Sequence, residues 1–433
     1  MRSMTKGILG VAAFAALALY GAAGCRHTED ANTIRFRYWG DTDEVTIIEG
    51  LVKDFEAANP GVIVKPERKP SDNTYADALL TEFASRTAPD VMFVSTDNIE
   101  VLAESNMLAD LSPWLAKDPD LKAADYYDAM IKRFSKDGKL LVLPRDISPI
   151  SCIYYNKDLF DKAKLPYPKD DWNWEDLRSD AIKLTHRDAN GTAKQIGFAD
   201  DWNLVDAWIL AGGGQHMDDF THPTRFTFAE GGALDGILFR YKLQQVDQAM
   251  PSSADNQAFN GGSMAMFLNG NLGMFHSGLW KTPGFRKIQS FKWDVAPFPR
   301  RAGVQPVYWS GGSGYTMRSD VANPELCWKL IRFMAGPDGE KRIAATGLAQ
   351  PALKALANSP VFLDGQDPQN KKMLLYCAEH SLATPAWKPW VEFVDTMWRP
   401  KTDPMWIKGY DGDPTALIKS LQDEANAKFF PKK

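Results

Sequence analysis

Three patterned segments near the start of the chain constrain its fold most. Residues 34–41, IRFRYWGD, alternate apolar with charged or polar side chains at the period of a half-buried strand. Residues 44–61 carry apolar side chains at helical spacing and stop at Asn-Pro-Gly, and residues 62–68, VIVKPER, have strand character again. A strand, a helix and a strand in this order predict a parallel sheet with a right-handed crossover.

The same unit then repeats. Residues 71–87 predict a helix, residues 89–98 a strand with a continuous apolar run, and residues 99–107 another helix. In open sheets of this kind, ligands bind beyond the carboxyl ends of the strands. The residues that we expect at this rim are Trp39, Asp41, Asp97 and Asn98.

Two segments have the character of crossings between two lobes. Residues 144–149, PRDISP, have a proline at each end, which stiffens a segment without committing it to a sheet. Residues 306–317, PVYWSGGSGYTM, run from a strand into closely spaced glycines. Segments that cross together can act as a hinge, so we expect two discontinuous lobes.

The N-terminal segment predicts export. Residues 1–24 begin with basic side chains, continue with an apolar stretch over residues 8–20 and end in small residues, the pattern of a signal peptide. The apolar stretch is shorter than the roughly 20 residues of a membrane-spanning helix, which makes a transmembrane anchor the weaker interpretation. The sequence AAGC resembles a bacterial lipobox, which implies a lipidated Cys25 followed by a tether over residues 25–33. The expected location is the periplasmic or extracellular face of the bacterial membrane, and a soluble secreted protein is the alternative.

Composition and cysteine count indicate the kind of partner to expect and the state of the cysteines. The net charge is −5, with 44% hydrophobic and 24% charged residues, which indicates a globular chain and argues against nucleic acid as the main partner. Besides Cys25, the chain has Cys152, Cys327 and Cys377, an odd number in apolar surroundings, so we expect buried thiols and leave their redox state open.

Signals for catalysis or metal binding are weak. The sequence has no HExxH, paired CxxC, P-loop or GxSxG motif. Residues 187–192 and 410–414 have some likeness to metal loops, but neither has the ligand set of a calcium loop, which favours turns. We therefore expect no enzyme, no cofactor and no metal.

Eight segments, in this order, carry a resemblance to a known family: FEAANPGVIVK, YADALLTEFASRTAPDVMFV, GKLLVLP, IYYNKDLFDKAKL, WNWEDL, GSMAMFLNG, DVAPFP and NPELCWKLIRFMAGPDG. Together they resemble family 1 extracellular solute-binding proteins, the receptors of ABC importers that include maltose-binding protein. The resemblance implies a two-lobe α/β fold of the periplasmic-binding-protein type II, with a ligand cleft between lobes joined by hinge crossings. It also implies closure on a small-molecule ligand and delivery to ABC permease subunits, and we expect a monomer. The expected N-terminal lobe is 34–146 plus 311–370, and the expected C-terminal lobe is 147–310 plus 371–433.

The resemblance also implies ligand-binding positions. The family often uses the turn after the first strand, the acidic residue after the PDV strand, both crossings, and aromatic side chains of the second lobe and the C-terminal helices. In this sequence these positions correspond to Trp39, Asp41, Asp43, Asp97, Arg145, Asp146, Trp202, Gly311 and Gly312, and to Trp387 or Trp390. Some sugar binders of the family have an aromatic side chain where this chain has Val94 and another where it has Leu272, and we expect Trp280 or Trp309 to fill those places instead.

These residue types suit a sugar. Aromatic faces stack on the C–H faces of a sugar ring, and carboxylates, amides and arginine bind its hydroxyls. Each position also has a structural alternative: the tryptophans can be core, Asp97 can cap a helix, Arg145 can pair with Asp146, and the two glycines can form a turn.

The leading hypothesis is a lipid-anchored receptor for a mono- or oligosaccharide. A polyamine or a sugar phosphate on the same fold is one alternative. An exported glycoside hydrolase is another, and it would need two carboxylates about 5–10 Å apart. Neither the identity of the sugar nor that of the permease follows from the sequence.

Overall fold

The computed structural model describes most of the chain after its N-terminal segment. It covers residues 32–69, 74–150, 152–201, 205–220, 222–259, 261–383, 387 and 389–431. The predicted signal peptide of residues 1–24, the predicted lipidation site Cys25 and the predicted site residue Trp202 lie outside the described residues.

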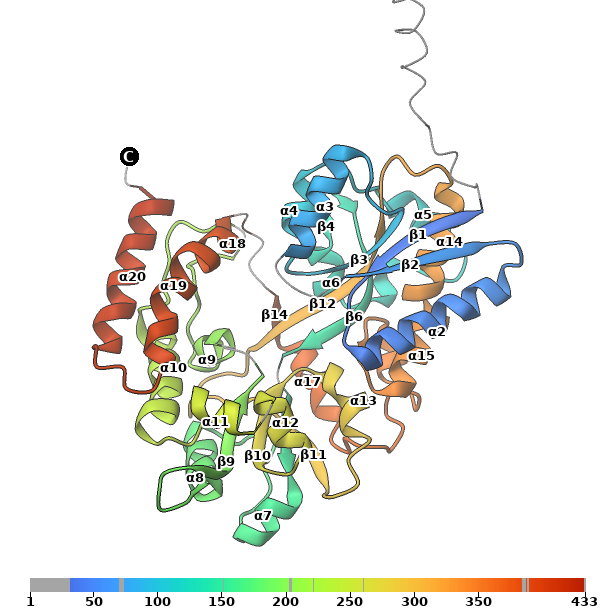
Figure 1. Cartoon of the computed structure of the whole chain (residues 1–433). Helices are drawn as coiled ribbons and strands as arrows, with labels where there is room; N and C mark the ends of the chain where they lie inside the picture. The colour runs from blue at the N-terminus through green and yellow to red at the C-terminus, as the bar shows by residue number, and fades with distance from the viewer. Residues whose placement is uncertain are drawn as a thin grey trace, which may run out of the picture.

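The first sheet forms the centre of the first lobe, shown in blue, teal and orange in Figure 1. In the described part of the chain its strands are β1 (Thr33–Tyr38), β2 (Ile63–Arg68), β3 (Val91–Ser95), β6 (Leu143–Pro149), β12 (Tyr308–Met317), β13 (Gln350–Pro351) and β14 (Ser381–Ala383). They lie in the order β13-β6-β12-β3-β1-β2, and β14 pairs with β12. The predicted parallel opening is confirmed, because β1 pairs in parallel with both β2 and β3. The strands β6 and β12 run antiparallel to each other.

Amphipathic helices pack on this sheet and complete the first core. They are α2 (Thr42–Ala58), α3 (Thr74–Ser85), α4 (Ile99–Glu104), α5 (Ser112–Lys117), α6 (Asp128–Arg133), α14 (Pro324–Ala335), α15 (Pro337–Thr346) and α16 (Lys354–Ala357), with a 3-10 turn η1 (Ala123–Asp125) and the hairpin of β4 (Ser135–Lys136) and β5 (Lys139–Leu140). The apolar run of β3, Val91 to Val94, is fully buried, as its composition predicts.

A second sheet forms its own core below the first in Figure 1. Its strands are β7 (Cys152–Asn156), β8 (His186–Arg187), β9 (Ala193–Asp200), β10 (Leu272–Ser277) and β11 (Trp293–Pro297), in the order β11-β7-β10-β9-β8. The accompanying helices are α7 (Lys157–Ala163), α8 (Trp174–Leu184), α9 (Val205–Ala211), α10 (Gly231–Tyr241), η2 (Lys242–Val246), α11 (Ser253–Ala258), α12 (Gly262–Leu268), η3 (Leu279–Lys281), α13 (Thr282–Phe285) and α17 (Lys372–Glu379). Two sheets with separate cores make the two-lobe α/β fold that the sequence predicts.

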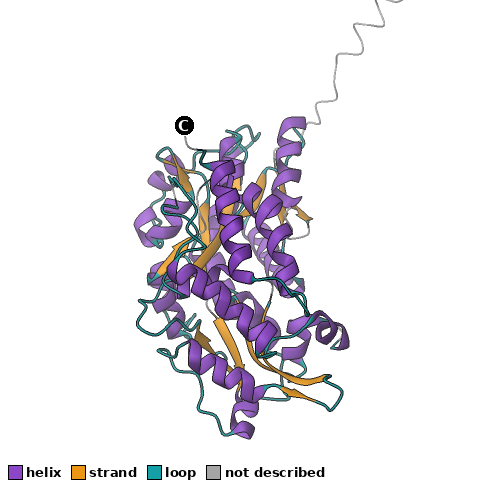
Figure 2. Ribbon diagram, turned by 90° about the vertical axis from the view of Figure 1, so that its left-hand side faces the viewer, coloured by secondary structure: helices purple, strands orange, loops and turns teal. Residues whose placement is uncertain are grey.

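The C-terminal helices build a third, aromatic cluster beside the second lobe. They are α18 (Pro389–Phe393), η4 (Val394–Trp398), α19 (Arg399–Thr402), η5 (Asp403–Trp406) and α20 (Pro414–Phe429). Figure 2 shows them in front of the strands, and their apolar faces pack with α9 and α10.

The crossings differ from the sequence-based expectation. Residues 144–149 belong to the buried strand β6, so the prediction that PRDISP stays outside a sheet is wrong. Pro144 is accommodated because the register shifts beside it, pairing Pro144 with Gly314 and Asp146 with Ser313 and leaving Arg145 in a bulge. The chain next forms β7 of the second sheet, which begins at Cys152.

The second crossing is the strand β12 itself. Tyr308 at its start packs in the second core, and Tyr315 near its end packs in the first. Position 312 within this strand needs glycine, because a Cβ there would come within 2.4 Å of the Met130 sulfur and 2.8 Å of the Asp146 carbonyl oxygen. The glycines therefore allow close packing inside a continuous strand and do not interrupt it.

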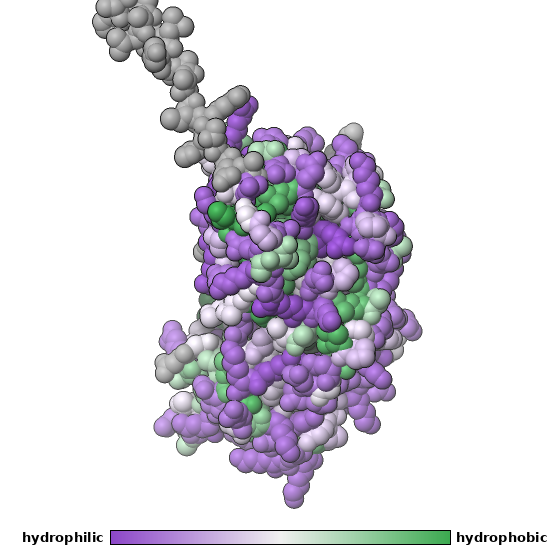
Figure 3. All heavy atoms as spheres, turned by 90° about the vertical axis from the view of Figure 1, so that its right-hand side faces the viewer, coloured by the Kyte–Doolittle hydropathy of each residue, from purple (hydrophilic) through white to green (hydrophobic). Residues whose placement is uncertain are grey.

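Burial and surface polarity match the expected globular class. Cys152, Cys327 and Cys377 are all buried, which confirms the prediction of buried thiols. On the face beside α2, hydrophobic residues form separate areas among hydrophilic ones (Figure 3). Within the described ranges, every helix is too short or too polar to cross a bilayer.

Candidate ligand-binding site

Two of the predicted site residues follow the carboxyl end of β1 in the first sheet. The Trp39 ring lies half-buried with its centroid 4.7 Å from that of Tyr75 and 4.4 Å from that of Phe93. Asp41 is exposed and caps α2, its Oδ1 accepting a hydrogen bond from the Glu44 backbone N–H at 3.2 Å. Each side chain thus has a structural contact and an accessible part, and ligand contact there stays a prediction.

The turn after β3 meets the glycines of β12. The Thr96 backbone N–H donates to the Gly312 carbonyl at 2.9 Å, and a Cβ on Gly311 would lie 3.4 Å from the Thr96 hydroxyl. This hydroxyl is buried and has no hydrogen-bond partner among the described residues. Asp97 is exposed and Asn98 half-buried beside it. A polar group of a ligand placed over Gly311 could satisfy the Thr96 hydroxyl.

Arg145 and Asp146 lie inside a buried network of charges. Arg145 Nε donates to Asp146 Oδ2 at 2.6 Å, and its Nη1 donates to Glu44 Oε1 at 2.9 Å. The guanidinium also lies 4.2 Å from the Phe93 ring centroid. Asp146 accepts two further hydrogen bonds from Ser313, from its N–H at 3.1 Å and its hydroxyl at 2.6 Å. Arg145 and Asp146 are 5% and 1% exposed, so their charges are used within the first lobe.

Burial and neighbouring charges shift the pKa values of this network in opposite directions. Burial lowers the pKa of Arg145, but the carboxylates of Asp146 and Glu44 outweigh it, so the pKa lies above its usual value. Burial raises the pKa of Glu44 despite the opposing charge of Arg145. Ligand contact by Arg145 and Asp146 stays an untested prediction, and what the structure shows for both is pairing.

Trp280 is a predicted site residue that the second lobe supplies. It sits half-buried on η3 and packs on the first core, so it bridges the two lobes. Gly278 is required behind it, because a Cβ there would overlap the indole ring. Next to it, Lys281 Nζ lies 3.1 Å from Asp201 Oδ2, and the Ser277 hydroxyl donates to the same oxygen at 2.9 Å.

A histidine joins two of the predicted tryptophans. The His216 ring centroid lies 5.6 Å from that of Trp309 and 5.0 Å from that of Trp390, both edge to face. His216 Nε2 lies 2.6 Å from Asp206 Oδ1 in the first turn of α9. Trp309 is buried and Trp390 half-buried, so the fold brings an aromatic pair and a carboxylate together around one imidazole.

Trp387 has a different environment from Trp390. Its ring stacks on Phe430 with 5.1 Å between centroids and also contacts Phe226 at 5.6 Å, both in the third cluster. The Trp387 ring packs against other aromatic side chains, and ligand contact by Trp387 stays a prediction. The predicted residue Trp202 lies outside the described residues.

Sequence reasoning missed four polar residues of this region: Thr96, Asp201, Asp206 and His216. Thr96 and Asp201 each follow a buried strand, so the rule that placed Asp97 at the rim could have included both. Asp206 and His216 gave no comparable signal, because their contact depends on how the loop after α9 folds back.

Comparison with known proteins identifies the family. The model of the bacterial extracellular solute-binding protein family matches residues 39–341, well over half of the chain. The chain belongs to this family.

Relatives of this solute-binding protein include the maltodextrin-binding protein MdxE of Bacillus subtilis, 24% identical over 294 residues that span 66% of each chain. The galactooligosaccharide-binding protein of the same organism is 24% identical over 335 residues, 76% of this chain and 75% of its own length. Among solved structures, the ABC substrate-binding protein Lmo0181 from Listeria monocytogenes in complex with cycloalternan superposes with a TM-score of 0.82 at 24% identity, covering 93% of this chain and all of that one. This likeness confirms the two-lobe fold.

The lobes of this solute-binding protein touch each other at the mouth of the site. Lys287 Nζ, just after α13, lies 2.5 Å from Asp43 Oδ1 in the first turn of α2. Nearby, Arg286 Nη1 donates to the Ala345 carbonyl oxygen at 3.2 Å, at the end of α15. Together with Trp280, these contacts join the two lobes.

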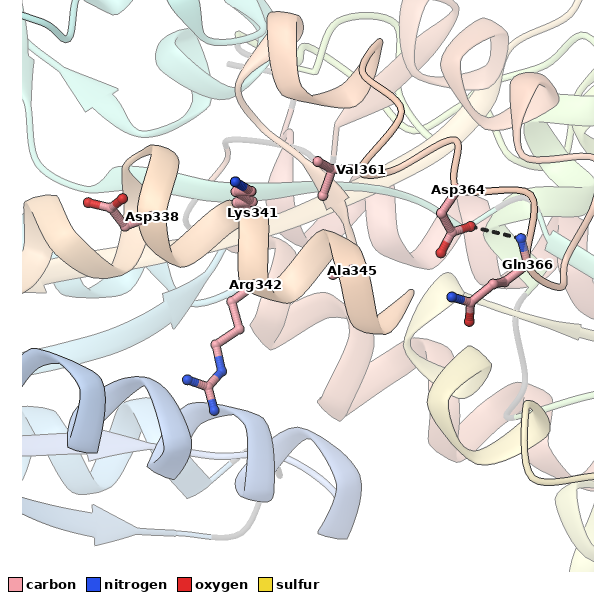
Figure 4. A pocket seen from close by; sticks show the side chains of 7 residues that line it. All are labelled: Asp338, Lys341, Arg342, Ala345, Val361, Asp364 and Gln366. Atoms are coloured by element: carbon pink, nitrogen blue, oxygen red, sulfur yellow. Dashed lines mark hydrogen bonds between the residues drawn. The ribbon is translucent and has the colours of Figure 1, made fainter.

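A separate pocket of about 510 Å³ lies between α15 and the loop of residues 361–366. Figure 4 shows Arg342 pointing out of it toward α2, where it pairs with Asp54, and Asp364 accepting the backbone N–H of Gln366. None of the predicted ligand residues that the structure describes lines this pocket. It is therefore distinct from the candidate site between the lobes.

Proposed function

We propose that the chain is the substrate-binding lipoprotein of an ABC importer, which captures a mono- or oligosaccharide between its lobes and delivers it to the permease. The observation that carries the proposal is the group of Trp390, Trp309 and Asp206 around His216. An accessible indole and a fixed carboxylate are the two contacts that a sugar ring needs. The oligosaccharide-binding functions named for both Bacillus relatives support the same class of ligand.

The charges near the site favour a neutral ligand over a sugar phosphate. Arg145 is paired with two carboxylates, and Lys281 is paired with Asp201. A phosphate would have to compete with these carboxylates for its cation. A polyamine fits carboxylates and aromatics as well, so it belongs in the test.

Binding is favoured over hydrolysis. The matched family is one of binding proteins, and the carboxylates of Asp201 and Asp206 are engaged by Lys281 and His216. We infer that the chain binds its sugar unchanged.

The ligand class can be tested by intrinsic tryptophan fluorescence of the chain from residue 26 onward. The titrants are maltose, maltotriose, a β-linked galactooligosaccharide, spermidine and glycerol 3-phosphate. We expect a saturable change with at least one sugar, lost in Trp390→Ala and kept in Trp387→Ala. A response to spermidine or glycerol 3-phosphate alone, with silence toward the sugars, would contradict the proposal.

Anchoring is a separate part of the proposal. We expect Cys25 to carry the lipid, so the full chain expressed in a bacterium should partition into the detergent phase of a Triton X-114 extraction. Cys25→Ala should move it to the aqueous phase, and a Cys377→Ala variant, in which a different cysteine is lost, should not. We also expect the protein to act as a monomer, which the elution volume in size-exclusion chromatography checks.

A further inference from the structure

The imidazole of His216 is enclosed by aromatic side chains from three parts of the chain. Besides Trp309 on β12 and Trp390 on α18, the Phe220 ring lies 6.2 Å away between centroids. His216 is 1% exposed, and within the described part of the chain neither of its ring nitrogens has a partner with hydrogen-bond geometry, although Nε2 lies 2.6 Å from Asp206 Oδ1. Burying an imidazole in such surroundings is costly unless its polar atoms are used.

The carboxylate that His216 contacts reaches the surface. The Asp206 side chain is 34% exposed, although its Oδ1 lies 2.6 Å from the buried Nε2 of His216. One oxygen of this carboxylate thus contacts the buried imidazole, while the carboxylate as a whole remains partly accessible to solvent. A carboxylate fixed in this way loses little further freedom when it accepts a hydrogen bond from a ligand.

Trp390 provides the second element. It contacts the same imidazole from α18 and is half-buried, so the residue is partly accessible to solvent. Its other close ring contact, to Phe393 at 5.6 Å, holds it from the third cluster. His216 therefore fixes an accessible carboxylate and an accessible indole at the same time.

We propose that Asp206 contacts the ligand directly, accepting hydrogen bonds from hydroxyls of the sugar ring that stacks on Trp390, and that His216 is the positioning residue that orients both. This inference rests on the proposed sugar-binding function. It adds a specificity-determining carboxylate, and its buried partner, that are absent from the positions implied by the family resemblance.

The test measures affinity by calorimetry for the sugar of the fluorescence panel that the wild type binds most tightly. We expect Asp206→Asn to lose at least about 10-fold in affinity, because the amide replaces charge-assisted acceptors. The matched control is Asp235→Asn, the same substitution at an exposed carboxylate of α10 that pairs with Arg301, and it should stay within about 2-fold.

Variants at His216 separate positioning from packing. His216→Gln keeps a donor toward Asp206 and should retain affinity within about 3-fold, whereas His216→Met fills a similar volume without a donor and should lose at least about 5-fold. Thermal unfolding checks that each variant folds. If the Met variant does not fold, ¹⁵N NMR of the wild-type His216 ring replaces it, and its nitrogen signals should shift when the sugar is added.

Each outcome decides a different part. Unchanged affinity in Asp206→Asn, in a protein that binds sugar, overturns the inference and leaves the proposed function intact. Loss in Asp206→Asn but not in His216→Met, or an unmoved His216 ring signal, overturns the positioning role. Absence of any sugar binding by the wild type overturns the proposed function and the inference with it.

Discussion

The two sides of the candidate site use polar side chains in opposite ways. On the first lobe, Arg145 and Asp146 are almost fully buried and bond to each other, to Glu44 and to Ser313. On the second lobe, the carboxylates of Asp201 and Asp206 are each held by one cation or imidazole and stay partly accessible beside tryptophans.

This difference indicates a division of roles. Charges that neutralise each other inside a lobe fix the crossing strands β6 and β12 relative to α2, and they have little capacity left for a ligand. A carboxylate that is one-third exposed and contacts a single side chain, as Asp206 does, keeps that capacity. We therefore assign the rigid frame to the first side and most polar ligand recognition to the second, and the following predictions challenge that assignment.

The largest effect is expected at Arg145. Removing the guanidinium in Arg145→Ala leaves Asp146 and Glu44 buried without their cation, which should lower the free energy of unfolding by about 3–5 kcal/mol in urea denaturation. The control Arg301→Ala removes an exposed partner of Asp235 and should change it by less than about 1 kcal/mol. A stable Arg145→Ala protein that no longer binds sugar would place Arg145 in the ligand site and break the comparison.

The two C-terminal tryptophans should separate stability from binding. Trp387→Ala removes a ring stacked on Phe430 and should lower the free energy of unfolding by about 2–4 kcal/mol without changing sugar affinity. Trp390→Ala should instead weaken sugar binding in the fluorescence titration, with the smaller stability loss of the two. The reverse assignment of effects would show that the ligand lies nearer the third cluster.

Asp180 on α8 offers a buried carboxylate without compensation, in contrast to Asp146. Burial raises the pKa of Asp180 to about 6, against a smaller opposing effect of Lys183. An acid whose pKa is raised on folding destabilises the protein increasingly as pH rises from its unfolded pKa, about 4, through its folded pKa. Asp180→Asn should therefore gain about 1–3 kcal/mol over the wild type at pH 8 and little or nothing at pH 4, measured by urea unfolding at both values. An equal difference at the two pH values would show that Asp180 is not buried uncompensated.

The smallest effect is expected at the contact between the lobes. Lys287 is 70% exposed and pairs with Asp43 across the mouth of the site, so the pair should favour the closed arrangement by about 0.2–1 kcal/mol. Lys287→Ala should weaken sugar binding by about 2–5-fold at low ionic strength and less in high salt. The charge exchange Asp43→Lys with Lys287→Asp should restore affinity, and failure to do so would attribute the loss to something other than this pair.

The sequence was sufficient for the architecture because its signals are local. The alternating and helical patterns of residues 34–68 predicted β1, α2 and β2, and the apolar run of residues 91–94 predicted β3. The proline-bounded segment 144–149 was misjudged because its acceptance into a sheet depends on a bulge at Arg145 and on Gly314 across the strand pair. Such a register cannot be seen in one strand alone.

The candidate site was less predictable for the same reason. Trp387 and Trp390 lie three positions apart with similar neighbours, yet one stacks on Phe430 and the other meets His216 edge to face. His216 meets Asp206 only because the loop after α9 returns to the helix. Contacts of this kind are set by tertiary packing, which neither periodicity nor motif spacing encodes.

A crystal structure of the complex with the tightest-binding sugar of the panel tests the division of roles most directly. We predict that the sugar ring lies on Trp390 with a hydroxyl within hydrogen-bond distance of Asp206, while Arg145 still bonds to Asp146 and Glu44. A sugar bonded to Arg145 or Asp146, with Asp206 and Trp390 out of contact, would contradict the account.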